Sequence, residues 1–311
     1  MEEKIDFVVT FVDKTDEYYI KKYNDFIKSH EIPIPEINNI EIRANDYGTL
    51  KCLFRSLDLY MPWINNVFLV VQSESQVPKW INRDAVKVVL HEEFIPKEFL
   101  PTYNTFTIQT HLHLIPGLSE KFISSDDDSI LLTKSLPEHF FIKDKVVQVV
   151  KKIDNSRIKG SSSKASHYFK MYSCKTPKEI FEIEDDFYYQ SDHSMHAMLK
   201  SLNSEMYNKL DVKKYITPFR QSGNIMRNSY FTYAFLKRKM IVLPSGKNAY
   251  IDFKNKTINN FRIWFNENCK RKQMSINDQD IKEGFDKKIF YKMITETIYK
   301  LFPNKSKKYE I

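Results

Sequence analysis

The sequence predicts an α/β fold in which strands and helices alternate along the chain. Residues 5–12 form a largely apolar run rich in β-branched and aromatic residues, which is typical of a buried strand. Residues 50–60 repeat leucine and phenylalanine at helical spacing. Two further strand-like runs follow at 67–71 and 85–90. Because the two kinds of element alternate, we expect them to pack in α/β layers.

The rest of the chain continues this alternation around a polar stretch. We expect helices over 18–30, 194–210 and 228–237, and strands at 250–253 and 263–265. Residues 151–170, rich in lysine and serine, are expected to form a mobile loop or to begin an inserted lobe. The alternative there is a lid that grips phosphate. Apolar residues over 289–302 recur at helical spacing, which favours core packing over attachment to a membrane surface.

Length and composition limit the class of protein. With 311 residues, of which 42% are hydrophobic, the chain can bury a substantial core and is not a disordered protein. No apolar stretch approaches the roughly 20 residues that a membrane-spanning helix needs. Residues 1–4 lead directly into the first strand-like run, so we expect no signal peptide. The three cysteines lack metal-ligand spacing and are expected to be reduced thiols in a cytoplasmic protein.

The positive charge of the chain narrows the choice of partner. A net charge of +8 favours nucleic acid, an anionic membrane face or a substrate that carries phosphate. We expect no nucleic-acid partner, because the sequence has no zinc-finger or RNA-binding signature. Glycine is scarce, with six residues, and neither common glycine-rich phosphate-binding motif occurs. A bound diphosphate would therefore be held by a metal and by basic side chains.

Three consecutive carboxylates, Asp126, Asp127 and Asp128, stand between two apolar runs. Burying an unpaired charge is costly, and neighbouring like charges raise each other's pKa. A divalent cation is the usual remedy, because hard oxygen ligands suit Mg²⁺ or Mn²⁺. The alternative is a solvated acidic turn. Asp13, which follows the first predicted strand, is also well placed, since ligands of open α/β sheets bind beyond the carboxyl ends of strands.

Several segments together are similar to the conserved regions of one protein family. Residues 5–13 are similar to its first region, and a long ordered match runs from Arg43 to Asp128. Shorter matches follow at His193–His196, Phe219–Ser222, Ile276–Asp278 and Phe302–Ser306, with Glu310 after the last. In this order they resemble the Stealth family of sugar-1-phosphate transferases. That family includes bacterial capsular-polysaccharide polymerases and the animal enzyme that tags lysosomal glycoproteins.

The match departs from the family pattern at positions that bear on function. Thr49 stands where the family usually has glutamate, and Gln109 also stands where glutamate is common. Asp126 stands where asparagine is usual, and Met195 replaces a proline. The changes at 49 and 109 are expected to alter substrate orientation. With Met195, they keep open a non-catalytic alternative.

The resemblance implies both a fold and an activity. The fold is a Rossmann-like, glycosyltransferase-A-like core sheet flanked by helices, with an inserted helical lobe. One catalytic domain would span 1–311, with its core at 1–150 and 191–311 and a variable insertion at about 151–190. The activity is transfer of a hexose- or N-acetylhexosamine-1-phosphate from a UDP-sugar to a hydroxyl of an oligosaccharide or polysaccharide acceptor. UMP leaves, and a phosphodiester forms in a capsular or cell-surface polysaccharide.

The resemblance also implies roles for particular residues. His193 would remove the acceptor proton and Arg220 would grip the phosphate, with Asp128 and Asp278 as further catalytic groups. Mg²⁺ (or Mn²⁺) would be held by Asp127, Asp128 and Asp278. The expected substrate- and nucleotide-binding residues are Thr10, Val12, Asp13, Lys14, Arg43, Asp46, Asn104 and Asn277.

Structural alternatives exist for each of these assignments. His193 is also compatible with an ordinary helix surface, Arg220 with a surface ion pair, and Asp278 with a helix cap. His111 and His113 lie two apart, as metal ligands sometimes do, but no cysteine or third histidine is near, so structural roles are favoured. For the whole protein, the alternatives are a conventional glycosyltransferase that releases UDP and a non-catalytic carbohydrate- or nucleotide-binding protein. We expect a cytoplasmic location, with peripheral contact at the inner membrane face as an open alternative.

Overall fold

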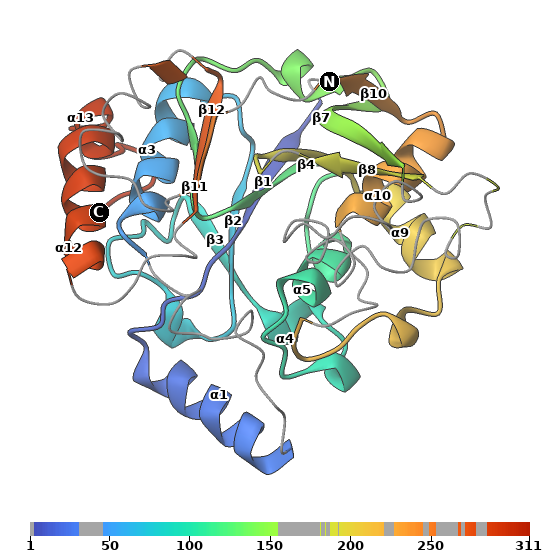
Figure 1. Cartoon of the computed structure of the whole chain (residues 1–311), viewed down its shortest axis with the longest axis horizontal. Coiled ribbons are helices and arrows are strands. Elements are labelled where there is room, and N and C mark those ends of the chain that lie inside the picture. The colour runs from blue at the N-terminus through green and yellow to red at the C-terminus, as the bar shows by residue number, and fades with distance from the viewer. Residues whose placement is uncertain are drawn as a thin grey trace.

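The chain folds around one central sheet, and two smaller sheets lie beside it (Figure 1). The computed structural model describes residues 3–30, 46–154, 181, 184, 187–191, 193–220, 227–244, 249–252, 267–268, 271–277 and 285–311. In Figure 1, α3 and α12 lie on one side of β1 and β2, and α9 and α10 lie on the other. This layering is the α/β arrangement that the alternating sequence pattern predicts.

The central sheet has the strand order β3-β2-β1-β4-β9. The strands β1 (Ile5–Thr10), β2 (Val67–Val71), β3 (Val86–Leu90) and β4 (Lys121–Asp126) are parallel, and β9 (His196–Leu199) is antiparallel to β4. The order 3-2-1-4 of the parallel strands is that of a Rossmann-type half. The predicted Rossmann-like core sheet flanked by helices is therefore confirmed.

The strands β1 and β2 form because their side chains are buried on both faces of the sheet, whereas β3 alternates between buried and more exposed residues. All five residues of β2 are buried, and in β1 only the last residue, Thr10, is partly exposed. Parallel strands covered on both faces read as continuous apolar runs, which explains why the sequence revealed them. The helices of this half are α1 (Glu17–His30), α3 (Thr49–Tyr60), α4 (His91–Phe94) and α5 (Thr105–His111). The predicted helices at 18–30 and 50–60 are thus confirmed.

Short 3₁₀ turns complete the connections around the sheet. They are η2 (Glu74–Gln76), η3 (Lys97–Phe99), η4 (Leu112–Leu114), η5 (Pro137–His139) and η6 (Val212–Lys214). At the start of α3, Gly48 has a φ of 84°, a conformation that favours glycine. A Cβ atom there would lie 1.8 Å from the Tyr299 hydroxyl, so this position excludes a side chain for a steric reason as well.

The second sheet contains β6 (Phe141–Ile142), β7 (Lys145–Asp154), β8 (Phe187–Ser191) and β10 (Met240–Leu243). β7 extends into the region expected to be a mobile loop, and β8 returns antiparallel to it. Residues 151–154 and 187–190 are therefore sheet residues. Most of the predicted insertion, including its helical lobe, lies outside the described residues.

The helix predicted over 194–210 is wrong in its first part. Residues 196–199 form β9, whose four side chains are all buried, and the helix α9 begins only at Lys200 (Lys200–Lys209). Pairing with β4 overrides local helical preference here, because it completes the central sheet and buries His196 and its neighbours. The helix predicted over 228–237 is confirmed as α10 (Arg227–Leu236).

A third sheet joins β5 (Ser129–Leu131) to two strands from the last quarter of the chain. These are β11 (Ala249–Asp252) and β12 (Gln273–Asn277), in the order β11-β12-β5. The strand predicted at 250–253 is confirmed in β11 as far as residue 252, and that at 263–265 lies outside the described residues. This sheet matters for function because it brings the C-terminal part of the chain against the acidic tract after β4.

The apolar stripe near the end of the chain is part of the core, as predicted. It comprises α12 (Phe285–Met293), a π-helical turn (Ile294–Ile298) and α13 (Tyr299–Leu301). Its side chains pack with β5 and β12, and the fully buried ones are Phe290, Met293, Ile294 and Ile298. Within the described part of the chain, no helix combines the length and the apolar character needed to cross a bilayer.

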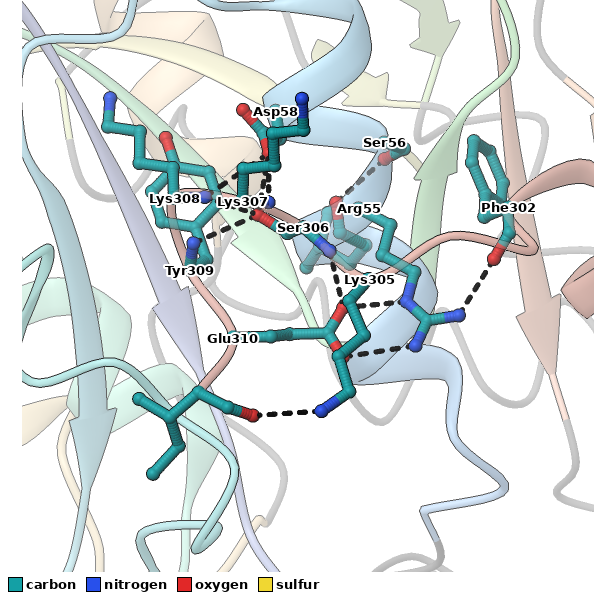
Figure 2. Close-up of polar contacts among 12 residues, drawn as sticks. Arg55, Ser56, Asp58, Phe302, Lys305, Ser306, Lys307, Lys308, Tyr309 and Glu310 are labelled. Carbon is teal, nitrogen blue, oxygen red and sulfur yellow. Dashed lines mark hydrogen bonds and ion pairs between the residues drawn. The ribbon is translucent and has the colours of Figure 1, made fainter.

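The last ten residues run back along α3 (Figure 2). Asp58 accepts hydrogen bonds from the Ser306 hydroxyl and from the backbone amide of Lys307. Glu310 pairs with Arg55 and forms an isolated β-bridge with Ile81. Tyr309 is fully buried against the central core. The C-terminal segment 302–311 is thus an integral part of the fold.

Candidate active site

The site lies at the carboxyl ends of β1 and β4. Thr10, the last residue of β1, is paired in register with Asp126, the last residue of β4. The turn Asp127–Asp128 follows at once, and the backbone amide of Ile276 donates to the Asp128 carbonyl at 3.2 Å. The predicted acidic tract therefore sits where ligands bind in α/β sheets, with β12 beside it.

Asp126 is held by groups from two helices. The Nη2 atom of Arg227, at the start of α10, donates to Asp126 Oδ1 at 2.9 Å and to Oδ2 at 3.1 Å. Gln109, on α5, donates from Nε2 to Asp126 Oδ1 at 3.3 Å. Burial on its own would raise the pKa of Asp126, but Arg227, His193 and His196 outweigh it and lower this pKa to about 2. Asp126 is consequently a charged carboxylate at neutral pH.

His193 lies between two carboxylates of the tract. Its Nε2 atom is 3.8 Å from Asp126 Oδ2, and its Nδ1 atom is 3.8 Å from Asp128 Oδ1. The imidazole is 41% exposed, so a substrate can reach it. The Ser275 hydroxyl donates to the His193 carbonyl at 2.7 Å, and the Met195 amide donates to the Gln273 side chain at 2.9 Å. Residues of β12 thus fix the backbone that carries His193.

The pKa of His193 is lowered from its ordinary value. The surrounding protein is the main cause, and the guanidinium groups of Arg227 and Arg220 act in the same direction, whereas Asp126 opposes them. A lowered pKa keeps the imidazole neutral and able to accept a proton near neutral pH. His196, on β9 behind it, is 1% exposed, and burial lowers its pKa well below the ordinary value.

Arg220 is also brought to this side of the sheet. Its Nη2 atom donates to the Thr105 hydroxyl at 2.6 Å, and the guanidinium lies 5.1 Å from the ring centre of Phe106. Its charge is close enough to lower the pKa of His193. Arg220 therefore contacts the start of α5 and lies within electrostatic reach of the imidazole.

Asn104 has a different position from the one expected of a nucleotide ligand. It is fully buried and caps α5, where its Oδ1 atom accepts from the Phe106 amide at 3.1 Å. Its Nδ2 atom donates to the carbonyls of Thr217 at 3.0 Å and Phe219 at 3.2 Å. In this structure Asn104 ties the segment before Arg220 to α5, which is a positioning role.

The remaining predicted nucleotide residues that are described lie around the ends of β1 and α3. Asp46 accepts from the Gly48 amide at 2.8 Å, and its charge interacts with Asp13 and raises the pKa of Asp127. Asp13 accepts from both the amide and the hydroxyl of Thr15 at 2.7 Å. Val12 packs against an aromatic cluster under α1. Lys14 follows Asp13 in the same loop, partly exposed.

Arg43 and Asp278 lie outside the described residues, as does the side chain of Asn277. The backbone of Asn277 ends β12, one position after the Ile276 amide that contacts Asp128.

The acidic tract has the charge expected of a cation site. Burial raises the pKa of Asp127 well above its ordinary value, and the charges of Asp128, Asp46 and Asp126 add to this shift. Among the described residues, no group of three or more histidine, cysteine, aspartate or glutamate side chains is arranged to hold a metal ion. Mg²⁺ can be held by fewer protein ligands, since it keeps several waters and binds one or two carboxylates plus substrate phosphates. Asp127 and Asp128 fit this requirement.

His111 and His113 are buried and bonded to backbone carbonyls of their own segment. His111 donates from Nδ1 to the Thr107 carbonyl at 2.7 Å, and His113 from Nδ1 to the Thr110 carbonyl at 3.1 Å. Both rings pack against Tyr207, and burial lowers the pKa of His113 to about 4. Their surroundings agree with the structural roles favoured from sequence.

The sequence interpretation did not identify Arg227. No motif marks it, and its partner Asp126 was read only as part of the acidic tract. Gln109 was noted as a departure from the family pattern but not as a neighbour of Asp126. A basic residue at the first position of a helix is unremarkable by itself, so only the fold reveals this contact.

Part of the chain is similar to a known protein family. Residues 43–149 match the family described as Stealth protein CR2, conserved region 2. A capsular polysaccharide phosphotransferase of Streptococcus thermophilus is 38% identical over 143 residues, which are 45% of this chain and 59% of the relative. An exopolysaccharide phosphotransferase of Lactiplantibacillus plantarum is 36% identical over 142 residues, 45% of this chain and 40% of the relative. The chain therefore spans about half the length of these curated relatives.

Solved structures with some likeness are the apo bifunctional glycosyltransferase WbbM and mouse xyloside xylosyltransferase 1. Both are 12% identical, with TM-scores of 0.46 and 0.40; the first match covers 96% of this chain and 50% of that one, the second 87% and 97%. Because these scores are below 0.5, the fold assignment depends on the strand order itself. The matched residues 43–149 include Gln109 and the whole acidic tract of the site. The chain thus carries conserved region 2 of the Stealth proteins, which confirms the resemblance predicted from the sequence.

Proposed function

We propose that this chain transfers a hexose- or N-acetylhexosamine-1-phosphate from a UDP-sugar to a glycan hydroxyl. The product would be a phosphodiester in a capsular or cell-surface polysaccharide, with UMP as the leaving group. The observation that carries this proposal is the position of His193, which lies 3.8 Å from both Asp126 and Asp128 and within the electrostatic reach of Arg220 and Arg227. The printed names of the relatives as polysaccharide phosphotransferases support the same class of reaction.

His193 is the proposed general base. Its lowered pKa leaves it neutral, so its unprotonated ring nitrogen can take the proton of the acceptor hydroxyl. The acceptor oxygen then forms a bond to the phosphorus next to the sugar, and the bond from that phosphorus to the bridging oxygen breaks. The bridging oxygen leaves with UMP and takes the bonding electrons. The imidazolium that forms is stabilised by Asp126 and Asp128 on either side of the ring.

Negative charge on the transferred phosphoryl group needs nearby cations. Arg220 supplies a planar guanidinium whose paired N–H groups match phosphate oxygens, which a lysine does not match. Arg227 already donates to both carboxylate oxygens of Asp126, and we therefore assign it the role of positioning that side chain. Asp127 and Asp128, with Asp278, are the proposed residues for holding Mg²⁺ or Mn²⁺, which when bound would neutralise diphosphate charge.

The nucleotide end of the donor is assigned to the loop after β1 and the start of α3. Thr10 is the last residue of β1, and Asp13 and Lys14 lie in the loop that follows it. Asp46 lies close enough to Asp13 for their charges to interact. With Val12, Arg43 and Asn277 they are the proposed donor-binding residues. Asn104 would act indirectly, by tying the segment before Arg220 to α5.

The proposed partners follow from this reaction. They are a UDP-sugar donor and an oligosaccharide or polysaccharide acceptor, with no nucleic acid. We place the reaction in the cytoplasm, where nucleotide-activated sugars are substrates, and keep peripheral contact with the inner membrane face as part of the proposal.

The test is an incubation of the chain with UDP-N-acetylglucosamine, Mg²⁺ and an oligosaccharide acceptor, followed by mass spectrometry. Release of UMP and a product heavier by one sugar and one phosphate supports the proposal. Release of UDP would instead show a conventional glycosyltransferase. If a panel of UDP-sugars binds but neither nucleotide is released, the chain is a binding protein. His193→Gln is the matched inactive control, since it keeps size and polarity but cannot act as a base.

A further inference from the structure

The last part of the chain carries a large share of the positive charge. From Lys288 to Lys308 there are six lysines and one acidic residue, Glu296, which gives a net charge of +5. This is more than half of the net charge of +8 of the whole chain. None of these lysines belongs to the candidate active site.

The helix α12 in this stretch has a buried side and an exposed side. Phe290 and Met293 are fully buried in the core, together with Ile294 directly after the helix. On the opposite side, Tyr291 is 56% exposed and Lys292 is 63% exposed. Core packing, which the sequence favours for this helix, therefore accounts for one side of α12. The other side presents a lysine and an aromatic ring to solvent.

The same kind of surface continues after α12. Lys300 and Leu301 are exposed on α13, and Lys305 and Lys307 are exposed on the segment that runs back along α3 (Figure 2). In Figure 1, α12, α13 and the end of the chain lie together at one edge of the molecule. We define the C-terminal basic surface as Tyr291, Lys292, Lys300, Leu301, Lys305 and Lys307.

Two carboxylates beside the C-terminal basic surface reduce its charge without cancelling it. Glu296 is 30% exposed and lies 3.7 Å from the Lys292 amine. Asp58, on α3, accepts hydrogen bonds from the Ser306 hydroxyl and the Lys307 amide. With both carboxylates counted, the six lysines still leave a net charge of +4 at this edge. The surface is therefore complementary to an anionic partner.

Exposed apolar side chains decide which anionic partner fits. Leu301 is 37% exposed, and Leu59, next to Asp58 on α3, is 58% exposed. Lysines that alternate with aromatic and aliphatic side chains are typical of proteins that lie on an anionic bilayer. There, the lysines meet lipid phosphates and the apolar groups enter the boundary between headgroups and acyl chains. A nucleic acid would pair with the lysines but would offer the leucines no comparable apolar region.

We propose that the C-terminal basic surface binds the anionic face of a lipid bilayer, with its lysines at the lipid phosphates and Tyr291 and Leu301 among the headgroups. This deepens the membrane contact included in the proposed function, and it rests on that function only for the choice of the inner face. Tyr299, between this surface and the core, packs against Gly48 at the start of α3. The bound bilayer would therefore adjoin the part of the fold where Asp46 is assigned to the donor.

Binding to vesicles without substrate tests the proposal. The chain is sedimented with vesicles of phosphatidylcholine alone or of phosphatidylcholine mixed with phosphatidylglycerol. Because each lysine near an anionic surface strengthens binding by about fivefold, we expect binding to the mixed vesicles to be at least about a hundredfold tighter. Raising NaCl from about 0.1 M to about 1 M should remove most of this difference, since it shortens the screening length from about 10 Å to about 3 Å.

A charge variant locates the binding surface. It replaces four exposed lysines of the C-terminal basic surface by glutamine: Lys292→Gln, Lys300→Gln, Lys305→Gln and Lys307→Gln. We expect its binding to mixed vesicles to fall by about a hundredfold. Its urea midpoint should stay within error of the parent value, because the replaced side chains are exposed.

The matched control removes the same number of charges elsewhere. Lys143, Lys145, Lys209 and Lys213 are also exposed and lie on β7, on α9 and in the turns next to them. Figure 1 shows β7 and α9 far from α12 and α13. Replacing these four lysines by glutamine should change vesicle binding by less than about threefold. An equal loss in both variants would overturn the proposal, because net charge and not this surface would then drive binding.

An apolar variant separates a bilayer from a soluble polyanion. Tyr291→Gln/Leu301→Gln keeps every lysine and should weaken binding to mixed vesicles by about tenfold, while binding to heparin stays unchanged. If the variant binds vesicles as the parent does, the apolar side chains do not enter the bilayer and the proposal fails. It fails also if heparin at the same charge concentration displaces the parent chain completely from the vesicles, which would indicate a soluble anionic polymer as the partner.

The vesicle measurements and the test of the proposed reaction can fail separately. Equal binding of the parent chain to neutral and mixed vesicles, or no binding to either, would overturn the membrane surface even if UMP is released. This result comes from the parent chain and so does not depend on the folding of any variant. Binding with the expected lipid and salt dependence supports the surface even if no UDP-sugar is used, and in that case only the proposed reaction fails.

Discussion

Arg55 and Glu310, which are 255 positions apart in the sequence, form a two-point ion pair. Nε of Arg55 lies 2.6 Å from Oε1 of Glu310, and Nη2 lies 3.0 Å from Oε2. The same guanidinium donates from Nη1 to the Phe302 carbonyl at 2.7 Å. One side chain of α3 therefore fastens both ends of the C-terminal segment 302–311 (Figure 2).

Glu310→Gln should lower the free energy of unfolding by about 3 kcal/mol, because it leaves the Arg55 charge enclosed without a partner. The two side chains are 11% and 1% exposed, so solvent screens this pair weakly. Glu74→Gln is the matched control: its pair with Arg83 is 60% and 50% exposed and should contribute less than about 1 kcal/mol. Urea unfolding at pH 7 measures both. Equal losses in the two variants would contradict the assignment.

The same pair predicts how stability depends on pH. Burial opposes ionisation of Glu310, but its bonds to Arg55 and the Ser306 amide outweigh burial and lower its pKa in the folded state. Its stabilising contribution is therefore complete above the unfolded pKa of about 4.3 and is lost as pH falls through the folded value. Urea unfolding of the parent chain and of Glu310→Gln should converge as pH is lowered below about 4. A difference that stays constant down to pH 2 would refute this.

Asn104→Asp should separate capping from positioning. The carboxylate can still accept from the Phe106 amide and cap α5, but it cannot donate to the carbonyls of Thr217 and Phe219. We expect a stability loss of about 1–3 kcal/mol from the two lost hydrogen bonds, although each carbonyl keeps a threonine hydroxyl as its other donor. Because these contacts hold the segment before Arg220, turnover should fall more than the folded fraction does. Thr110→Ser, on the same helix, is a mild control.

Asp127→Asn should stabilise the chain when no divalent cation is present. The pKa of Asp127 is raised by burial and by three neighbouring carboxylates, so its charged form opposes folding. A raised carboxyl pKa makes stability fall as pH rises above the unfolded value, so the gain should be seen at pH 7 and vanish near pH 3. Addition of Mg²⁺ should stabilise the parent chain more than the variant. Thermal unfolding with EDTA and with MgCl₂ measures both effects, and an identical response to Mg²⁺ would exclude Asp127 as a ligand.

His193→Gln should reduce kcat by about 10²–10⁴-fold while KM for the donor changes little, since a general base acts in the transition state. The histidine backbone is held by Ser275, so the substitution should leave stability nearly unchanged. Steady-state kinetics together with urea unfolding check this. An intact kcat would assign proton removal to another group.

Much of the fold could be predicted because the central strands are apolar without interruption. β1 and β2 are buried on both faces, and that burial is what their sequences display. β9 could not be predicted in this way. Its four residues adjoin a helix-forming stretch, and only the edge of β4 that they complete makes them a strand.

The candidate site was predictable where its charged residues are adjacent in the sequence. The tract at 126–128 follows a buried strand, and it does lie at the carboxyl end of the central sheet. His193 and Arg220 were recognised through short motifs, and the fold brings both toward that tract. Asn104 fits the motif equally well, yet its side chain is fully buried and holds backbone carbonyls.

The sequence by itself determined the α/β layering, the acidic turn and the resemblance to the Stealth proteins, because these are visible in local patterns and short motifs. The tertiary structure alone decided that Arg227 holds Asp126, 101 positions earlier, and that Gln109 contacts the same carboxylate. Such pairings depend on the path of the chain through three sheets. A local pattern contains no information about which distant charge will share the same enclosed space.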